Sequence, residues 1–373
     1  YAIDGEYGRT QKSIVFSTQS THKLLASLSQ ASQILVQDAT NNPLDRYRFN
    51  EAYLMHASTS PQYSIIASCD IAAAMMDAPG GTALTEESLI EAMDFRHAMR
   101  KAEAEFAELN TWWFKVWGPE HLPNNGIGSS SDWQIKAGDD WHGFGAIEPD
   151  MNILDPIKTT VMMPGLNMTG TFEETGIPAA IVAKYLSDYG IIIDKVGLYS
   201  FFVIFNIGIT KGRWSSLLIE LQQFKDIYDD NKPVWRIFPE FAKSYPQYEK
   251  MGIKDLCQAI HDTYKKYNIA HTLHDMYVKP IVPAMTPAEA WGRVAHRKVM
   301  RVNVRDLTTQ HVTGVLLTPY PPGIPLLIPG EYMTQEVIDY LHFTLEFNTQ
   351  FPGFEQSAHG LIFFFSSRRR HTR

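Results

Sequence analysis

The chain has 373 residues, of which 45% are hydrophobic, so it is long and apolar enough for two globular units with buried cores. It carries 33 Lys and Arg against 41 Asp and Glu, with no basic stripe before its last residues, which argues against a nucleic-acid partner. Cys69 and Cys257 lie far apart and indicate a reducing compartment, so we expect a cytoplasmic protein. The most apolar stretch, 201–209, is too short to span a bilayer, and no membrane partner is expected.

The first segments predict a strand, a polar turn and a helix. Residues 13–16 are typical of a short buried strand, and residues 24–29 are typical of a helix. The turn between them, 17–21, is rich in hydroxyl side chains. Because hydroxyls and backbone N–H groups at a helix start can hold a phosphate, this arrangement indicates a ligand site.

Two longer helices are expected next, followed by a connecting region. The first covers residues 62–76, and the second covers 86–109 with Thr85 as its N-cap. Residues 110–140 are rich in Trp, Gly, Asn and Ser and show no clear periodicity, which favours a surface connection. We therefore place a domain boundary near residue 145.

The second half of the chain mixes strands and helices. A helix is predicted at 179–189 with Gly190 at its C-terminal end, followed by strands at 191–193 and 199–209 and a helix at 213–228. This order favours an α+β domain.

Towards the end, the prolines between residues 319 and 325 exclude both a helix and a central strand. The last helix, 335–347, has Thr334 as its expected cap. Three apolar residues share the face that should pack on the core: Val337, Leu341 and Leu345.

The chemistry concentrates at Ser20-Thr21-His22-Lys23. A lysine amine beside a bound phosphate can form a Schiff base with an aldehyde, which burial and a nearby cation favour by lowering its pKa. His22 could stack on such a cofactor or hydrogen-bond to it. Read in isolation, the tetrapeptide is a weak signal, because a capped helix with a surface lysine gives the same pattern.

A longer series of segments strengthens the cofactor reading. It runs in order along the chain as far as about Leu361: Phe16–Leu25, Arg48–Tyr53, Ser58–Pro61, Trp141–Phe144, Leu154–Lys158, Pro319–Pro325, Pro329–Glu331 and Phe351–Phe354. In these segments the chain resembles the bacterial lysine, arginine and ornithine decarboxylases, which are pyridoxal-phosphate (PLP) enzymes of fold type I. The resemblance implies an α/β and α+β fold, in which residues 1–145 are the C-terminal part of the PLP-binding major domain and residues 146–361 are the α+β C-terminal domain.

The resemblance also implies roles for single residues. Lys23 would bind the cofactor covalently, and Ser20 and His22 would contact its phosphate. A hydroxyl of Ser58 or Ser60 would reach the phosphate bound by a neighbouring subunit, which would make the active site depend on a homodimer. Family members commonly stack such dimers into larger rings, so a decamer is a further expectation.

The substrate expected from the resemblance is a basic amino acid. Asp194 lies where the lysine decarboxylases of the family carry a Glu that meets the distal ammonium group of the substrate. One carboxylate suits a compact ammonium better than a planar guanidinium. Lysine is therefore favoured, with arginine next and ornithine third. The alternative is that Asp194 pairs with Lys195 in solvent.

Two departures from the family stand out. Family members carry a ring-stacking His and an Asp that pairs with the pyridinium nitrogen upstream of the lysine, whereas 22 residues precede Lys23 here. We therefore interpret the chain as a fragment that is inactive alone. Residues 362–373 do not match the family, and we expect a non-native or disordered tail.

Other interpretations stay open or are set aside. His271 and His274 have helical spacing for a metal pair, but no third ligand is evident and no metal is predicted. An aminotransferase of the same fold would share Lys23 and give a keto acid instead of an amine. A non-catalytic assembly subunit is a further alternative, in which Lys23 would carry no cofactor.

Overall fold

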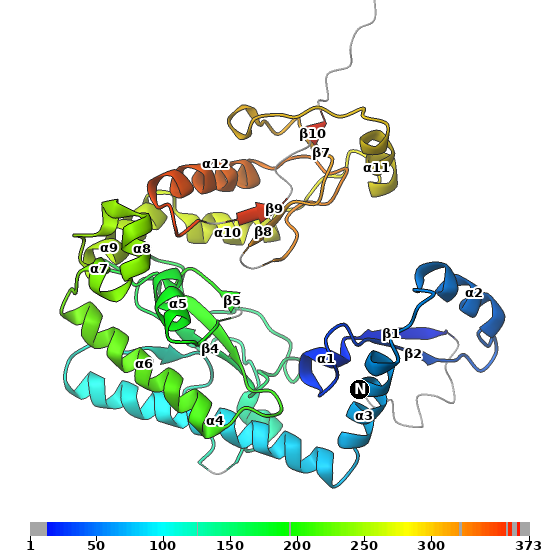
Figure 1. Cartoon of the computed structure of the whole chain (residues 1–373), viewed down its shortest axis with the longest axis horizontal. Helices are drawn as coiled ribbons and strands as arrows, with labels where there is room; N and C mark the ends of the chain where they lie inside the picture. The colour runs from blue at the N-terminus through cyan, green and yellow to red at the C-terminus, as the bar shows by residue number, and fades with distance from the viewer. Residues whose placement is uncertain are drawn as a thin grey trace, which may run out of the picture. The chain divides into compact units, whose positions relative to one another are not determined.

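The computed structural model describes residues 13–124, 126–193, 195–320, 323–355, 357–359 and 364–365. The chain forms two compact units, whose helices and strands are labelled in Figure 1. The first unit extends to Met93 and includes Phe205–Thr210; the second comprises Asp94–Ile204 and the residues from Lys211 onward. The boundary near residue 145 concerns the domains of the family and stays a prediction.

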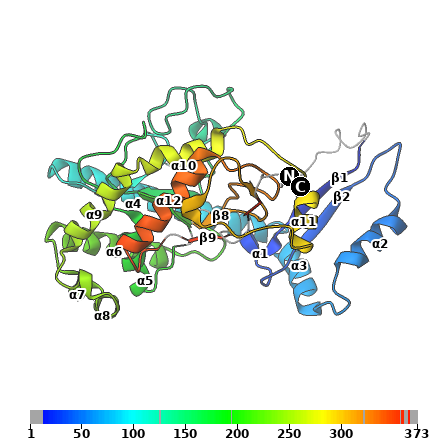
Figure 2. The same cartoon turned by 90° about the horizontal axis from the view of Figure 1, so that it is seen from above.

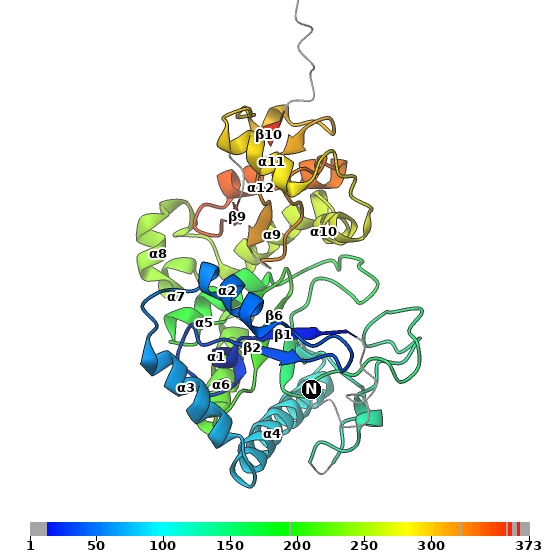
Figure 3. The ribbon, with the colours of Figure 1, turned by 90° about the vertical axis from the view of Figure 1, so that its right-hand side faces the viewer.

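The first unit contains a two-stranded antiparallel sheet and three helices, and it shares a fourth helix with the second unit. The strands β1 (Val15–Gln19) and β2 (Gln33–Gln37) lie side by side in Figures 2 and 3. The helices are α1 (Thr21–Leu24), α2 (Arg46–His56), α3 (Tyr63–Met75) and the shared α4 (Gly80–Glu108). All five residues of β1 are exposed, and none of the residues of α2 is buried. This unit therefore holds little core around its sheet.

Two predictions for the first unit are wrong: the helix at 24–29, and Thr85 as the N-cap of α4. The helix predicted at 24–29 is absent, because α1 ends at Leu24 and Leu25 is extended. The segment after it hydrogen-bonds to α3 instead: Ser27 Oγ donates to the Ser68 carbonyl (3.1 Å), and Leu28 N donates to Ser68 Oγ (3.1 Å). The helix α3 confirms the prediction for 62–76.

Thr85 is not the N-cap of α4. The helix begins at Gly80, and the Thr85 hydroxyl donates to the Gly81 carbonyl (2.7 Å) one turn back, as an interior threonine does. The sequence pattern did not indicate this start, because the helix opens with Gly80 and Gly81 and glycine is a poor helix former.

The second unit is built on a four-stranded antiparallel sheet in the order β3-β4-β6-β5. Its strands are β3 (Lys115–Val116), β4 (Lys158–Met162), β5 (Lys195–Val196) and β6 (Ser200–Ile204). The helices α5 (Ala179–Asp188) and α6 (Lys211–Asp229) pack together, and α5 also contacts β5 and β6. Fully buried apolar side chains join these layers: Phe114, Val161, Ile181, Val182, Tyr185, Phe201, Leu221 and Phe224.

The strand predicted at 191–193 is wrong. Ile191 N donates to the Leu186 carbonyl (2.9 Å) and Gly190 N to the Ser187 carbonyl (3.0 Å), so this segment closes α5. Gly190 has φ +79°, the left-handed conformation expected at a helix C-terminus. The strand predicted at 199–209 is shorter than expected and covers Ser200–Ile204.

The rest of the second unit is mainly helical. Short helices α7 (Val234–Ile237) and α8 (Pro239–Ser244) precede α9 (Ile253–Lys266), α10 (Ile269–Val278), α11 (Pro287–Ala295) and α12 (Gln335–Gln350). Single turns of 3₁₀-helix occur at Ser130–Trp133, Pro246–Tyr248 and Val304–Asp306. Figure 1 shows α10 and α12 packed against one another, as their contacts require. Thr334 caps α12 as predicted, with its hydroxyl accepting from Val337 N (3.3 Å).

Two small sheets complete this part. Strand β8 (Thr318–Tyr320) pairs with β9 (Ser357–His359), and β7 (Val312–Thr313) pairs with β10 (Phe364–Phe365). Pro319 thus lies in a two-stranded sheet rather than a central strand, as predicted. Apart from 364–365, the segment 362–373 lies outside the described residues, and its nature stays a prediction. Among the described helices, none combines the length and the apolar character that crossing a membrane requires.

Candidate functional site

Ser20 is the N-cap residue of α1 and leads into Lys23. Lys23 N donates to the Ser20 carbonyl (3.1 Å), which closes one helical turn. The Ser20 side chain makes no capping hydrogen bond and is exposed, so its hydroxyl remains available. The strand predicted at 13–16 as buried is wrong in bounds and burial, because β1 covers Val15–Gln19 and is exposed, and it takes up most of the turn predicted at 17–21. A single helical turn follows and carries Lys23.

Thr21 is the one buried residue of this turn, with 6% of its surface exposed. Its Oγ1 is buried and has no hydrogen-bond partner among the described residues. Burying a hydroxyl without a partner costs about 1–3 kcal/mol, so such a group is unusual unless a ligand or another chain satisfies it. The sequence drew attention to Thr21 as one of several hydroxyls and could not single it out.

His22 and Lys23 differ in how they are held. His22 is half-buried, and its Nδ1 lies 2.9 Å from the Ala31 carbonyl oxygen, which fixes the orientation of the ring. Lys23 is exposed, and its amine has no hydrogen bond or ion pair within the described part of the chain. The lysine amine is thus free to react, and the neighbouring ring is already oriented.

Ser58 and Ser60 lie on an exposed loop after α2. Ser60 N donates to Ser58 Oγ (3.1 Å), a local turn that orders the loop. Within the described residues no hydrogen bond joins this loop to residues 20–23. Their expected role towards a neighbouring subunit stays a prediction.

The remaining predicted binding residue, Asp194, lies outside the described residues. Its neighbour Lys195 places its amine over the Phe202 ring, 5.7 Å from the ring centroid. Asp194 as the residue that meets the substrate stays a prediction.

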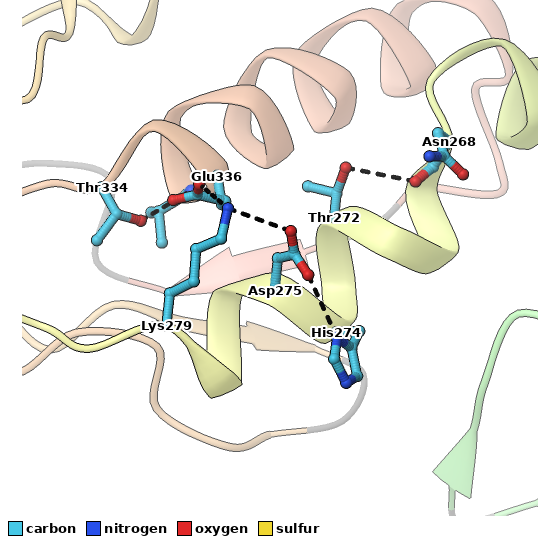
Figure 4. Close-up of polar contacts among 8 residues, drawn as sticks. Asn268, Thr272, His274, Asp275, Lys279, Thr334 and Glu336 are labelled. Atoms are coloured by element: carbon cyan, nitrogen blue, oxygen red, sulfur yellow. Dashed lines mark hydrogen bonds and ion pairs between the residues drawn. The ribbon is translucent and has the colours of Figure 1, made fainter. Parts of the chain in front are cut away.

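The two histidines considered as a metal pair lie on α10, and His274 lies against a carboxylate. Its Nδ1 is 3.2 Å from Asp275 Oδ1 (Figure 4). No group of three or more His, Cys, Asp or Glu suited to a metal ion occurs among the described residues. Asp275 also pairs with Lys279, which pairs in turn with Glu336 of α12.

The residues around Lys23 fit a phosphorylated aldehyde cofactor. The hydroxyl of Thr21 is buried and unpartnered among the described residues, and that of the preceding Ser20 is exposed, so donors for a phosphate are present. The Lys23 amine supplies the nucleophile for an aldehyde. These residues could hold such a cofactor, and the role of Lys23 as its binding residue stays a prediction.

Comparison with known proteins assigns the family. The profile described as "Orn/Lys/Arg decarboxylase, major domain" matches residues 1–213, and that of the "Orn/Lys/Arg decarboxylase, C-terminal domain" matches residues 270–370. The chain belongs to the Orn/Lys/Arg decarboxylase family. This confirms the family resemblance and the mixed α/β and α+β fold class.

Individual relatives agree with this assignment. The chain is 45% identical to the lysine decarboxylase LdcA of Pseudomonas aeruginosa over 96% of its own length and 49% of LdcA. It is 37% identical to the biodegradative arginine decarboxylase of Escherichia coli over 96% of its length and 50% of that enzyme. The solved structure of lysine decarboxylase A from Pseudomonas aeruginosa superposes with a TM-score of 0.88, at 43% identity, covering 94% of this chain and 48% of that one. The chain thus spans about half the length of the curated relatives it matches.

Proposed function

We propose that the protein to which this chain belongs decarboxylates a basic amino acid with PLP as cofactor. The observation that carries the proposal is the buried, unpartnered Thr21 hydroxyl two residues before the free amine of Lys23. In a phosphate site, Thr21 and Ser20 would donate to phosphate oxygens, and Lys23 would hold the aldehyde carbon. When bound, PLP supplies an electron sink for the carbon that loses its carboxylate.

The other residues of the turn support this role by position. His22 is held by the Ala31 carbonyl and would lie against the cofactor without moving its ring. We infer that Ser58 or Ser60 serves the phosphate of a second copy of the chain, so the functional unit would be a homodimer that can stack into a decamer.

For the substrate we infer L-lysine, with arginine and then ornithine as alternatives. The 45% identity to the lysine decarboxylase LdcA supports lysine, although the arginine decarboxylase (37%) and a constitutive lysine decarboxylase of Escherichia coli (36%) are equally similar to the chain. Asp194 would be the carboxylate for the distal ammonium. Comparing the turnover of the three amino acids by the full-length protein tests this order, and a preference for arginine would overturn it.

The test of the cofactor site uses the full-length protein. We expect Lys23→Ala to remove the visible absorbance of bound cofactor, the adduct trapped by borohydride and nearly all amine production. Lys250→Ala, at an exposed lysine of the same chain, is the matched control and should change none of these. A borohydride-trapped adduct that persists in Lys23→Ala would show that another lysine holds the cofactor.

A second variant separates phosphate binding from folding. Thr21→Val replaces the buried hydroxyl by a methyl group of similar size, so without PLP it should be neutral or slightly stabilising. With PLP it should weaken cofactor retention about tenfold, because a charge-assisted hydrogen bond is lost. Unaltered retention would show that Thr21 does not face the phosphate.

The same assays distinguish the other classes. A keto acid instead of an amine as product would indicate an aminotransferase, and a chain that traps no PLP on Lys23 would indicate an assembly subunit.

A further inference from the structure

The second unit contains a cavity of about 740 Å³ that none of the proposed cofactor or substrate residues lines. It lies where the end of α4 meets β3 and the loop that carries Trp141. Its volume falls in the range of sites for small molecules, roughly 300–1,000 Å³.

Aromatic and apolar side chains form part of the wall. Trp117 and Trp141 meet edge to face with ring centroids 4.7 Å apart, and both are half-buried. Trp141 is fixed by its own loop, because its Nε1 donates to Asp139 Oδ2 (3.2 Å). Met162 and Met168 add flexible apolar surface. Indole faces attract cations, and methionines accept an aliphatic chain of variable length.

The charged residues around the cavity are mostly acidic. Five carboxylates line it, against three Lys or Arg side chains: Glu103, Glu120, Asp132, Asp139 and Asp140, and Arg100, Lys115 and Lys136.

One of the three cations is paired with a carboxylate. Lys115 pairs with Glu103 (3.8 Å), whereas Arg100 donates to the neutral carbonyls of Gly118 (3.5 Å) and Pro119 (3.0 Å) and keeps its positive charge, so the carboxylates exceed the cations by two. Among the described residues Glu120 and Asp140 have no hydrogen bond or ion pair. The cavity therefore combines unpaired negative charge with aromatic faces.

We propose that this cavity binds an aliphatic diamine or polyamine, with ammonium groups at Glu120 and Asp140 and the methylene chain against the two indoles. The chemistry suits the diamine that the proposed decarboxylation would release, so as a regulatory site the cavity rests on the proposed function. Binding of the diamine itself does not depend on the proposed function, since none of the residues that line the cavity belongs to the Lys23 site.

The experiment is a calorimetric and tryptophan-fluorescence titration of full-length Lys23→Ala protein with 1,5-diaminopentane. The protein is first freed of PLP, because PLP held without Lys23 could still form a Schiff base with the diamine. We expect saturable binding that weakens with added salt, because exposed charges are screened. Pentane-1,5-diol and glutarate should not compete. The absence of saturable binding, or tighter binding of glutarate, would overturn the proposal.

Variants then locate the site. Glu120→Gln with Asp140→Asn should weaken diamine binding about tenfold or more, since both charge partners are lost. Trp141→Leu should abolish the fluorescence response and also weaken binding. The control pair Asp70→Asn with Glu249→Gln removes two exposed carboxylates elsewhere and should bind as before. Binding left unchanged by both pairs would place the diamine outside this cavity.

The outcome is separable from that of the proposed function. If the unmutated protein makes no amine but Lys23→Ala protein still binds the diamine at this cavity, the cation site stands and the decarboxylase proposal fails. If amine is made and Lys23→Ala protein binds no diamine, the decarboxylase proposal stands and the cation site fails.

Discussion

Arg96 is a buried cation without a carboxylate partner in hydrogen-bond contact. It is fully buried, and its guanidinium donates to three backbone carbonyls: Pro156 (3.2 Å), Trp117 (3.1 Å) and Lys158 (2.9 Å). The guanidinium carbon Cζ of Arg96 also lies 5.4 Å from the centroid of the Trp133 ring. Burial, with a smaller effect of Arg100, lowers the pKa of Arg96 to about 10, so it stays charged at neutral pH. One side chain thus connects α4 to β4 and to the loop after β3.

We predict that Arg96→Lys destabilises the protein by about 2–4 kcal/mol, because an ammonium cannot reach three separated carbonyls and leaves buried acceptors unsatisfied. Urea unfolding followed by circular dichroism measures the change. Arg213→Lys, at an exposed arginine of α6, should shift the midpoint little. A midpoint equally unaffected in both variants would show that the carbonyl contacts contribute no net stability.

At the residue scale, the sequence shows Lys23 beside several hydroxyls because these residues are neighbours in the chain, while its role as the cofactor lysine stays a prediction. The contacts of Arg96 could not be predicted, since its carbonyl acceptors at Trp117 and Pro156 lie 21 and 60 residues away. The sequence indicated Thr21 only as one of four residues with hydroxyl groups in this segment, because the burial of a side chain depends on the fold.

At the element scale, Lys279 clamps α10 to α12 (Figure 4). Its amine lies 3.2 Å from Asp275 Oδ2 at the end of α10 and 2.6 Å from Glu336 Oε1 in the first turn of α12. The hydrogen bond from Lys279 lowers the pKa of Glu336. For Asp275, hydrogen bonds from His274 and then Lys279 lower the pKa. The carboxylates are therefore stabilised in their charged form.

The pH dependence of the clamp follows from these directions. A carboxylate whose pKa is lowered by folding contributes stability above its unfolded pKa of about 4, and this contribution is lost as the pH falls through the folded value. The pKa of Lys279 is raised, chiefly by its hydrogen bond to Glu336, so its contribution is complete below about pH 10 and lost above the folded value.

We predict that Lys279→Met speeds amide hydrogen exchange at the start of α12 a few-fold at pH 7, the size expected of an exposed ion pair. The difference should shrink as the pH falls below about 4 through the lowered pKa values of the two carboxylates, and vanish once both are protonated. Lys298→Met removes an exposed charge near α11 and serves as the control. An effect that persists unchanged in acid would assign it to lost packing of the lysine stem instead.

At the element scale, long helices were predicted better than short segments. α3 and α12 occur as expected, and Val337 and Leu341 are buried, whereas Leu345 is 38% exposed. The helix at 24–29 and the strand at 191–193 were wrong because distant or helix-closing hydrogen bonds take up their backbone groups. Single-residue preferences carry no information about either kind of bond.

At the scale of the whole molecule, the two units differ in how much core they hold. In the first, β1 and β2 form a two-stranded sheet whose apolar residues, such as Phe16 (50% exposed) and Leu35 (48%), face solvent. A sheet of this size is marginal without further strands or a packed layer. In the second, α5, α6 and α9 bury continuous apolar faces. The proposed cofactor residues thus belong to the less enclosed unit.

We predict from this difference that the purified 373-residue chain, supplied with PLP, releases no measurable amine from lysine, arginine or ornithine. Lys23 and Ser20 are exposed, so water would compete for any cofactor bound there, and catalysis on PLP needs a site from which water is excluded. Product analysis with full-length protein as the positive control measures the difference. Amine formed by the chain alone, and lost in its Lys23→Ala variant, would show that these residues suffice for the reaction.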